Sequence, residues 1–293
     1  MTRSGPLRLA SLFLTVFAAS AHAKPAEPLW EIGLSFGAPG LAPGTYEHRY
    51  TPTLSNHPEA TGAAGQDVKL DGDRGTALAA SLTRMLGPRL GVQLMLGATR
   101  SPLGGPSGDC SWTLRYEARQ PPDYQPRPIE VTGSVPWSTT DGELRQLVVA
   151  ASVLARFPLA DSVSVSLSGG VSALRLEGDL SPLAVTLFSE GGHATLFSEI
   201  YKARVVFEPL TTAGLQAGAE VAWHLSRTLS LALEARYFAA RSTHLEPKYE
   251  AVLNNDEVIH QATPAELEER APLQRVEIDS SFGAVWAGVR YRF

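Results

Sequence analysis

The chain has 293 residues, of which 44% are hydrophobic, and its formal net charge is −5. So mild a charge gives no reason to expect a nucleic-acid partner. The only cysteine, Cys110, excludes an intramolecular disulfide and a Cys-rich metal site. Without a leader segment about 270 residues would remain, which suits one large all-β domain or two small ones.

The first segment reads as a leader for export. Arg3 and Arg8 precede an apolar stretch from Leu9 to Ala21, and Ala21-His22-Ala23 forms an A-x-A cleavage site. A transmembrane anchor is the alternative, but the stretch is shorter than the roughly 18 residues that a spanning helix needs. We therefore expect residues 1–23 to be a signal peptide and the mature chain to begin near Lys24.

Alternation of apolar and polar residues dominates the rest of the chain. The clearest instance is SVSVSLSGGVSA, in which Val163, Val165 and Leu167 alternate with serines, and this period of two is typical of a strand with one polar face. In chain order the alternating segments are 30–36, 78–83, 90–97, 145–157, 162–173, 215–225, 229–237 and 284–293. There are eight of them, an even number, as a closed single-chain barrel requires.

The links between these segments alternate strictly between short and long. The short ones are GPR (87–89), PLADS (158–162) and SRT (226–228), whereas 38–73, 101–142, 177–213 and 241–275 each exceed thirty residues. Short periplasmic turns and long extracellular loops give this pattern, which counts against a compact soluble domain. We expect the long links to be mobile loops without a second domain. The exception is TPAELEER, where Thr263, Pro264 and Glu266 predict a short capped helix.

The composition of the polar face favours a membrane. It consists mainly of Ser, Gly, Ala and Gln, whereas a secreted β-sandwich, the alternative, would carry an outer face rich in Lys and Glu. The sequence therefore predicts an all-β fold, an eight-stranded antiparallel up-and-down transmembrane β-barrel in the outer membrane. Residues 24–293 would form this single domain, with long extracellular loops and short periplasmic turns.

The last strand carries a resemblance to known proteins. The ending AVWAGVRYRF, with Val289, Tyr291 and Phe293 at alternate places, is similar to the C-terminal signature of bacterial outer-membrane proteins. The hairpin AEVAWHLSRTLSLALEARYF resembles strands of small OmpA-, OmpW- and OmpX-like barrels. The resemblance implies insertion by the barrel-assembly machinery, with outer-membrane lipid and lipopolysaccharide as surroundings. It implies no particular activity.

The inward face of this barrel carries charges. If SRT is a three-residue turn, Glu220 lies opposite Glu234, and like charges in that position repel unless cations intervene. Arg236 is one diagonal step away, Arg290 projects inward from the last strand, and Glu31 is a fifth member across the seam. We expect this network to plug the lumen structurally. The alternatives are a proton or ion path and, less favoured, a pair of catalytic acids.

No motif supports catalysis. His224 and Ser226 form an H-x-S motif that is similar to that of outer-membrane lipid A deacylases, but Ser226 is expected within a turn and no acid follows at an obvious position. We predict no catalytic residue, and hence no enzyme.

Metal and cofactor motifs are equally weak. Asp67, Asp71 and Asp73 lack the remaining ligands of a calcium loop, and we expect no cofactor and no metal. The other histidines of the mature chain are scattered without an H-E-x-x-H motif: His48, His57, His193, His244 and His260.

Together these features predict a non-enzymatic outer-membrane protein with a side-chain-filled lumen and large surface loops for envelope or surface interactions. A narrow channel for small solutes or apolar molecules is the alternative, followed by a membrane-embedded lipid hydrolase or acyltransferase. Cys110 lies in a link that is placed outside, so we expect a membrane-impermeant thiol reagent to label it on intact cells.

Overall fold

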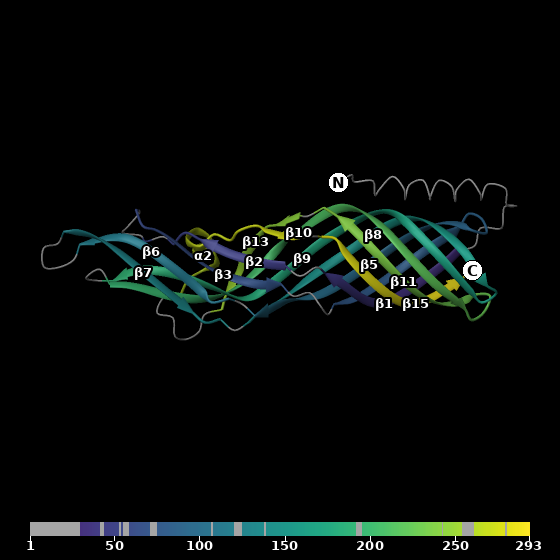
Figure 1. The fold of residues 1–293 in the computed structure, drawn as a ribbon, viewed down its shortest axis with the longest axis horizontal. Coiled ribbons are helices and arrows are strands. Elements are labelled where there is room, and N and C mark those ends of the chain that lie inside the picture. The colour runs from purple at the N-terminus through teal and green to yellow at the C-terminus, as the bar shows by residue number, and fades with distance from the viewer. Residues whose placement is uncertain are drawn as a thin grey trace, which may run out of the picture.

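The computed structural model of the chain describes residues 30–41, 44–52, 54, 59–70, 75–106, 108–119, 125–137, 139–191, 195–241, 243–253, 261–278 and 280–293. The predicted signal peptide, residues 1–23, lies outside the described residues and stays a prediction. Figure 1 shows an elongated molecule with a barrel at the end that carries the C-terminus.

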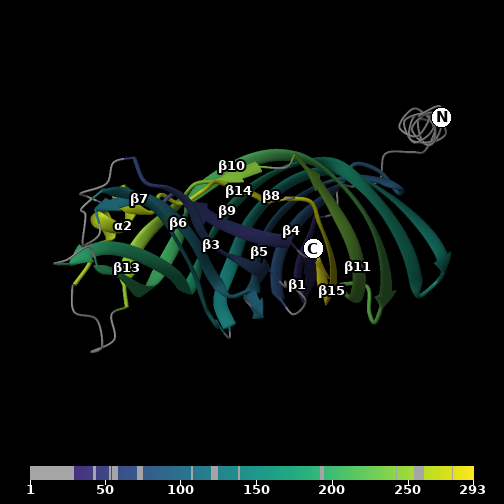
Figure 2. The same ribbon diagram turned by 60° about the vertical axis from the view of Figure 1, so that its left-hand side comes forward.

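Eight strands form a closed ring. They are β1 (Trp30–Leu41), β4 (Thr76–Met85), β5 (Leu90–Pro106), β8 (Thr139–Ala160), β9 (Val163–Gly191), β10 (Thr195–His224), β11 (Leu229–Ala240) and β15 (Phe282–Arg292). Each pairs antiparallel with its neighbour along the chain, and pairing of β1 with β15 completes the circle. The tilted ring is visible in Figures 1 and 2. The predicted eight-stranded up-and-down barrel is confirmed.

Three tight turns join strands at one end of the barrel, which we call the turn end. In the turn between β10 and β11 the amide of Leu225 donates to the carbonyl of Leu229 at 2.9 Å. The resulting register places Glu220 opposite Glu234, as the three-residue turn predicted. The predicted PLADS link is shorter than expected, because β8 continues to Ala160 and leaves only Asp161 and Ser162 in the turn.

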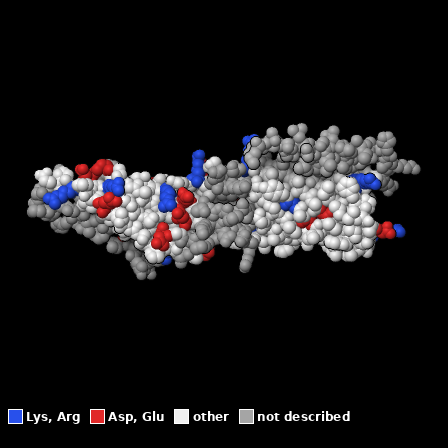
Figure 3. Space-filling model, in the orientation of Figure 1, with Lys and Arg blue, Asp and Glu red and all other residues white. Residues whose placement is uncertain are grey.

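The outer wall of the barrel is an apolar belt. Its exposed side chains include Ile32, Leu34, Phe36, Leu78, Leu94, Leu96, Leu147, Val149, Val171, Leu215, Leu231, Leu233, Val285 and Val289. A belt of this size in water would be an interaction or aggregation surface, whereas against lipid it is the favoured side, and the closed ring leaves no backbone edge unpaired there. In Figure 3 most of the visible charged groups lie over the end of the molecule away from the barrel. The ring therefore spans the membrane.

Among the described residues, no helix is long and apolar enough to cross a membrane.

The long links are folded where the structure describes them. They contain β2 (Gly44–Tyr50), β3 (Thr61–Leu70), β6 (Cys110–Arg119), β7 (Pro126–Val135), β12 (Thr243–Leu245), β13 (Pro247–Val252), α2 (Pro264–Arg270) and β14 (Val276–Ile278). The strands β2, β3, β6 and β7 form a four-stranded sheet, β12 pairs with β14, and β13 adds to β10. The expectation of links without regular structure is therefore wrong for these parts.

We call this second region the head. It comprises the elements of the long links together with residues 178–191 of β9 and 195–207 of β10, and it fills the end of the molecule away from the turn end (Figures 1 and 2). The predicted helix is confirmed: the hydroxyl of Thr263 accepts from the amide of Glu266 at 3.2 Å, and Leu267 is fully buried. Because β9 and β10 run through both regions, head and barrel share one continuous hairpin.

Two β-bulges interrupt this hairpin, one at the boundary between barrel and head and one just inside the head. Between Phe207 and Leu210, β10 has one residue more than β9, and between Leu180 and Leu183 the extra residue lies on β9. A one-residue slip exchanges the two faces of a strand. On β10 the even-numbered residues Gln216 and Glu220 are buried inside the barrel, whereas in the head the buried ones are odd-numbered: Tyr201, Ala203, Val205 and Phe207. The bulges thus bring apolar side chains into the head interior.

Candidate functional site in the barrel interior

The central feature of the barrel interior is one arginine between two carboxylates. Arg290 on β15 donates from Nε to Glu220 Oε2 at 2.9 Å and from Nη2 to Glu234 Oε2 at 3.0 Å. Each of the three side chains exposes only 7–8% of its surface. The cation lies where the two opposed carboxylates would otherwise repel.

Arg236 extends this cluster toward the strands on the other side. It pairs with Glu234, and its Nη2 donates to Gln93 Oε1 at 2.7 Å. The amide of Gln93 in turn donates to the hydroxyl of Thr83 at 3.2 Å. We call Glu220, Glu234, Arg236 and Arg290 the central cluster. It connects strands β10, β11 and β15 to β5 and β4, so it crosses the lumen.

The lack of a side chain at Gly33 makes room for Arg290. A Cβ placed on Gly33 would collide with the guanidinium of Arg290 and with the hydroxyl of Ser81, and Arg290 donates to that same hydroxyl. Glycine at position 33 is therefore a packing requirement of the charged lumen.

The direct partners of Glu31 lie outside the central cluster. It forms a second cluster with Arg156, whose two terminal nitrogens donate to the two carboxylate oxygens at 2.6 and 2.7 Å, and with Arg292, whose Nε donates to Oε1 at 2.8 Å. We call these three residues the rim cluster, since Glu31, Arg156 and Arg292 all lie near strand ends at the turn end. Glu31 was predicted as a fifth member of one network, and its ion pairs are with two arginines, Arg156 and Arg292, that the prediction did not include.

The sequence contains a signal for the two missed arginines. Arg156 has the inward parity of β8, where its neighbours Leu154 and Ser152 are buried, and Arg292 shares the parity of Arg290. Charges at inward positions of a barrel strand need partners inside. A search of every inward position for charge would have found both.

Neutral and apolar layers fill the rest of the lumen. Gln216 bonds to Ser152, and the hydroxyl of Thr99 donates to Gln146 at 3.0 Å. Along β5 and β8, Met95 and Val148 lie between these two polar pairs. With Phe238, Phe282 and Trp286 they form an apolar plate, which belongs to the same buried cluster as the head core. The rings of Phe238 and Phe282 stack with centroids 4.8 Å apart. Polar, charged and apolar side chains therefore reach into the lumen at several levels between the turn end and the head.

The H-x-S motif does not form a hydrolytic pair. His224 contacts Ser230 at 2.8 Å through Nδ1 and Ser164 at 3.1 Å through Nε2. Ser226 instead accepts from the amides of Thr228 and Leu229 within the turn. The histidine is held by two lumenal serines on neighbouring strands, which fits a structural role.

Within the described part of the chain, no group of three or more His, Cys, Asp or Glu side chains is arranged to hold a metal ion. Asp67 pairs with Arg49 in the head at 2.6 Å, and His244 lies on β12. Outside the described residues lie Asp71, Asp73, His57, His193 and His260.

The head interior contains a buried polar group that the sequence did not single out. His48 lies fully buried between Tyr46 and Tyr50, with Tyr249 3.5 Å from its Nε2. Burial, with a smaller contribution from Arg49, lowers the pKa of His48 from 6.5 to about 4. The imidazole is therefore neutral near pH 7.

Cys110 is also buried in the head. Its side chain is completely inaccessible, and Sγ lies 3.3 Å from the hydroxyl of Thr186. Burial raises the pKa of the thiol. Ready labelling of Cys110 in the folded protein is therefore no longer expected, since the reagent reaches it only when the head opens.

The predicted insertion signature lies on the outer wall. Val289, Tyr291 and Phe293 are each about half exposed, the rings of Tyr291 and Phe293 stack, and the amide of Phe293 donates to Trp30 at 2.9 Å. These aromatic rings sit at the turn end, where a membrane boundary favours them. Their recognition during insertion stays a prediction.

Comparison with known proteins gives matches of fold alone. No family model matches the chain, and no curated protein matches it. Among solved structures, Ail, the attachment invasion locus protein of Yersinia pestis, is 11% identical over 92% of this chain and 100% of its own, with a TM-score of 0.36. OprG from Pseudomonas aeruginosa is 11% identical over 92% and 98%, with a TM-score of 0.44. The outer membrane protease OmpT from Escherichia coli is 10% identical over 90% and 97%, with a TM-score of 0.37.

The closed ring of eight strands, its apolar outer wall and its ion-paired interior make this chain an outer-membrane β-barrel protein.

Proposed function

We propose that the protein is a non-enzymatic surface protein in which the barrel is a closed anchor and the head makes contacts outside the membrane. The observation that carries this proposal is the set of side chains inside the barrel: two ion-paired clusters lie on the turn-end side of an apolar plate that belongs to the same buried cluster as the head core. A solute would have to displace buried ion pairs and buried aromatic rings, and breaking such a pair costs several kcal/mol.

The head supplies the contact surface in this proposal. Its sheet ends at β7, which pairs with β6 on one side, and most residues of β7 are exposed or half-exposed. An exposed edge strand offers unpaired backbone groups to a partner chain. Neighbouring charges, such as the exposed pair Arg115 and Glu130, would set the specificity of such contacts more than their strength.

Solute flux tests the closed anchor against a narrow channel. The purified protein is reconstituted into liposomes, and swelling is measured in solutions of small sugars and amino acids. Swelling no faster than in protein-free liposomes is the expected result, because the lumen is filled. Swelling that grows with the amount of protein would favour the channel.

Product analysis tests the non-enzymatic part. The protein is incubated with lipopolysaccharide and, separately, with a peptide panel, and products are identified by mass. We expect no product, because His224 binds two structural serines and Ser226 is committed to a turn. A product that disappears in His224→Ala would replace this proposal with a hydrolase or acyltransferase.

A further inference from the structure

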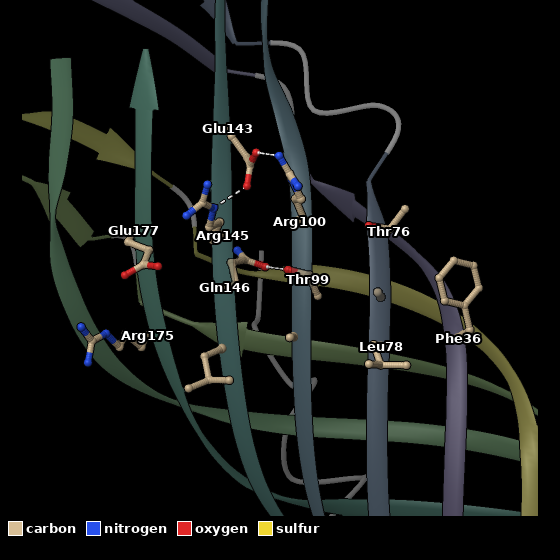
Figure 4. A pocket seen from close by; sticks show the side chains of 13 residues that line it. Phe36, Thr76, Leu78, Thr99, Arg100, Glu143, Arg145, Gln146, Arg175 and Glu177 are labelled. Carbon is tan, nitrogen blue, oxygen red and sulfur yellow. Dashed lines mark hydrogen bonds and ion pairs between the residues drawn. The ribbon is translucent and has the colours of Figure 1, made fainter. Parts of the chain in front are cut away.

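A depression of about 610 Å³ lies on the outer wall of the barrel, near the start of the head. Its lining comes from five neighbouring strands, β1, β4, β5, β8 and β9 (Figure 4). On one side it is apolar, with the outward side chains of Phe36, Leu78 and Leu147. On the other side the same strands carry Arg100 and Arg145. The depression is therefore amphipathic along the direction of the barrel axis.

Two arginines of this depression oppose each other. Arg100 on β5 and Arg145 on β8 are direct cross-strand partners on the outer face, an arrangement that is unfavourable for like charges. Both reach the one carboxylate of Glu143, as Figure 4 shows. Even so, 68% of the Arg100 side chain and 57% of the Arg145 side chain are exposed. Two guanidinium groups carry more donors than one carboxylate can accept.

A third arginine adds to this excess of positive charge. Arg175 on β9 lies opposite Leu147, one diagonal step from Arg145, and none of the ion pairs within the described residues includes it. Glu177 is the second carboxylate of the depression. Three arginines and two glutamates line it, so its charge is positive overall.

The position of the depression restricts what binds there. The wall on its turn-end side is the apolar belt, which faces hydrocarbon in the membrane. A soluble anion would meet the arginines but gain nothing from Phe36 and Leu78. A molecule with acyl chains and an anionic head group would gain from both.

We propose that this depression binds a phosphorylated lipid of the surrounding leaflet, of the lipid A type. Its phosphate accepts hydrogen bonds from Arg100 and Arg145, with Arg175 nearby, and an acyl chain lies along Phe36, Leu78 and Leu147. Glu143 competes with the phosphate for the two arginines. The site is independent of the head contacts proposed above, since its lining residues lie on the barrel strands.

Lipid titration followed by native mass spectrometry tests this site on the full chain in detergent. The probe is diphosphoryl lipid A. The double variant Arg100→Gln/Arg145→Gln should retain lipid A about tenfold less strongly or weaker still, because each substitution removes charge-assisted hydrogen bonds to the phosphate. The matched control is Arg275→Gln, an exposed arginine that pairs with Glu246 in the head, which should leave retention unchanged. Heat-modifiable migration in gels checks that each variant is folded.

A second variant gives the opposite sign. Glu143→Gln removes the competing carboxylate, so lipid A should bind about threefold more tightly. Lipid A without phosphates should bind as weakly to the parent as diphosphoryl lipid A binds to the double variant, and inorganic phosphate alone should not displace the lipid at equal concentration. Equal retention by parent and double variant, weaker binding to Glu143→Gln, or binding of phosphate-free lipid A as tight as that of the diphosphoryl form would each overturn the proposal.

Discussion

The barrel and the head are built with opposite interiors on the same two strands. Inside the barrel β9 buries Ser164, Ser166 and Ser168, whereas inside the head the same strand buries Leu183 and Val185. In lipid the outer wall must be apolar, so polar and charged side chains are left for the lumen. In water the usual order returns, with apolar side chains inside. The surrounding solvent thus decides which face of an alternating strand is inside.

The two interiors are stabilised differently. The stability of the head core comes from burial of apolar surface. The stability of the barrel interior comes from the balance of buried charges, because removal of one charged partner leaves the other uncompensated. Substitutions in the two regions should therefore differ in size and in dependence on conditions.

The largest effect is expected in the central cluster. Arg290→Ala removes the cation that contacts both Glu220 and Glu234, and the two carboxylates then face each other in a buried lumen. We expect the free energy of unfolding to fall by about 3–5 kcal/mol. Urea unfolding in lipid vesicles measures this. A loss no larger than that of an exposed arginine would show that water fills the lumen.

A core substitution in the head should be nearly as costly but confined to the head. Leu183 is fully buried there, so Leu183→Ala should destabilise the head by about 2–5 kcal/mol. The reaction of Cys110 with a thiol reagent reports head opening, because the folded head covers it. Faster labelling with unchanged heat-modifiable migration of the barrel is expected. If the barrel also loses its heat-modifiable migration when the labelling of Cys110 becomes faster, the two regions unfold as one unit.

Acid should weaken the head through His48. Its pKa is about 4 in the folded head against about 6.5 when unfolded, so the unfolded state binds the proton more tightly. The head is then most stable above about pH 6.5 and loses stability as the pH falls toward 4, by about 3 kcal/mol. Urea titrations followed by the fluorescence of Trp112, which packs against Phe188, measure this. In His48→Gln the stability of the head should change less with pH over this range. A parent protein whose head is equally stable at pH 6.5 and pH 4 would contradict the assignment.

The smallest effect is expected on the surface of the head. Arg115 and Glu130 pair across β6 and β7 at 3.1 Å with at least half of each side chain exposed. Arg115→Ala should change the stability of the head by about 0–1 kcal/mol, in the same urea titration. A larger loss would indicate that this pair is part of a contact surface that orders the sheet.

Sequence reasoning reached the barrel more easily than the head, for physical reasons. In the barrel each strand alternates strictly, and a three-residue turn sets the register, so the opposition of Glu220 and Glu234 could be derived by counting. In the head the bulges beside Phe207 and Leu183 interrupt the alternation. Residues 183–188 are buried on both faces and show no period of two. Two strands of the long links do alternate, however: β2 buries Tyr46, His48 and Tyr50 and exposes Glu47 and Arg49, and β6 buries Leu114 and Tyr116 and exposes Arg115 and Glu117. This period of two was present in the sequence and was missed.

The partners of Glu31 could not be derived by counting residues from the turn of one hairpin. It depends on how far each strand is staggered around the closed ring, and therefore on every register between β1 and β15. Only with all eight registers known do Arg156 and Glu31 meet, from strands that are not neighbours.

The coupling free energy between Arg290 and Glu220 tests the closed, ion-paired lumen most directly. The double-mutant cycle compares Arg290→Ala, Glu220→Gln and the double variant by urea unfolding in lipid vesicles. If the lumen is filled as the contacts indicate, the double variant should be more stable than Arg290→Ala alone, with a coupling well above the roughly 1 kcal/mol of exposed pairs. Additive effects of the two substitutions would contradict the closed lumen and favour a water-filled channel.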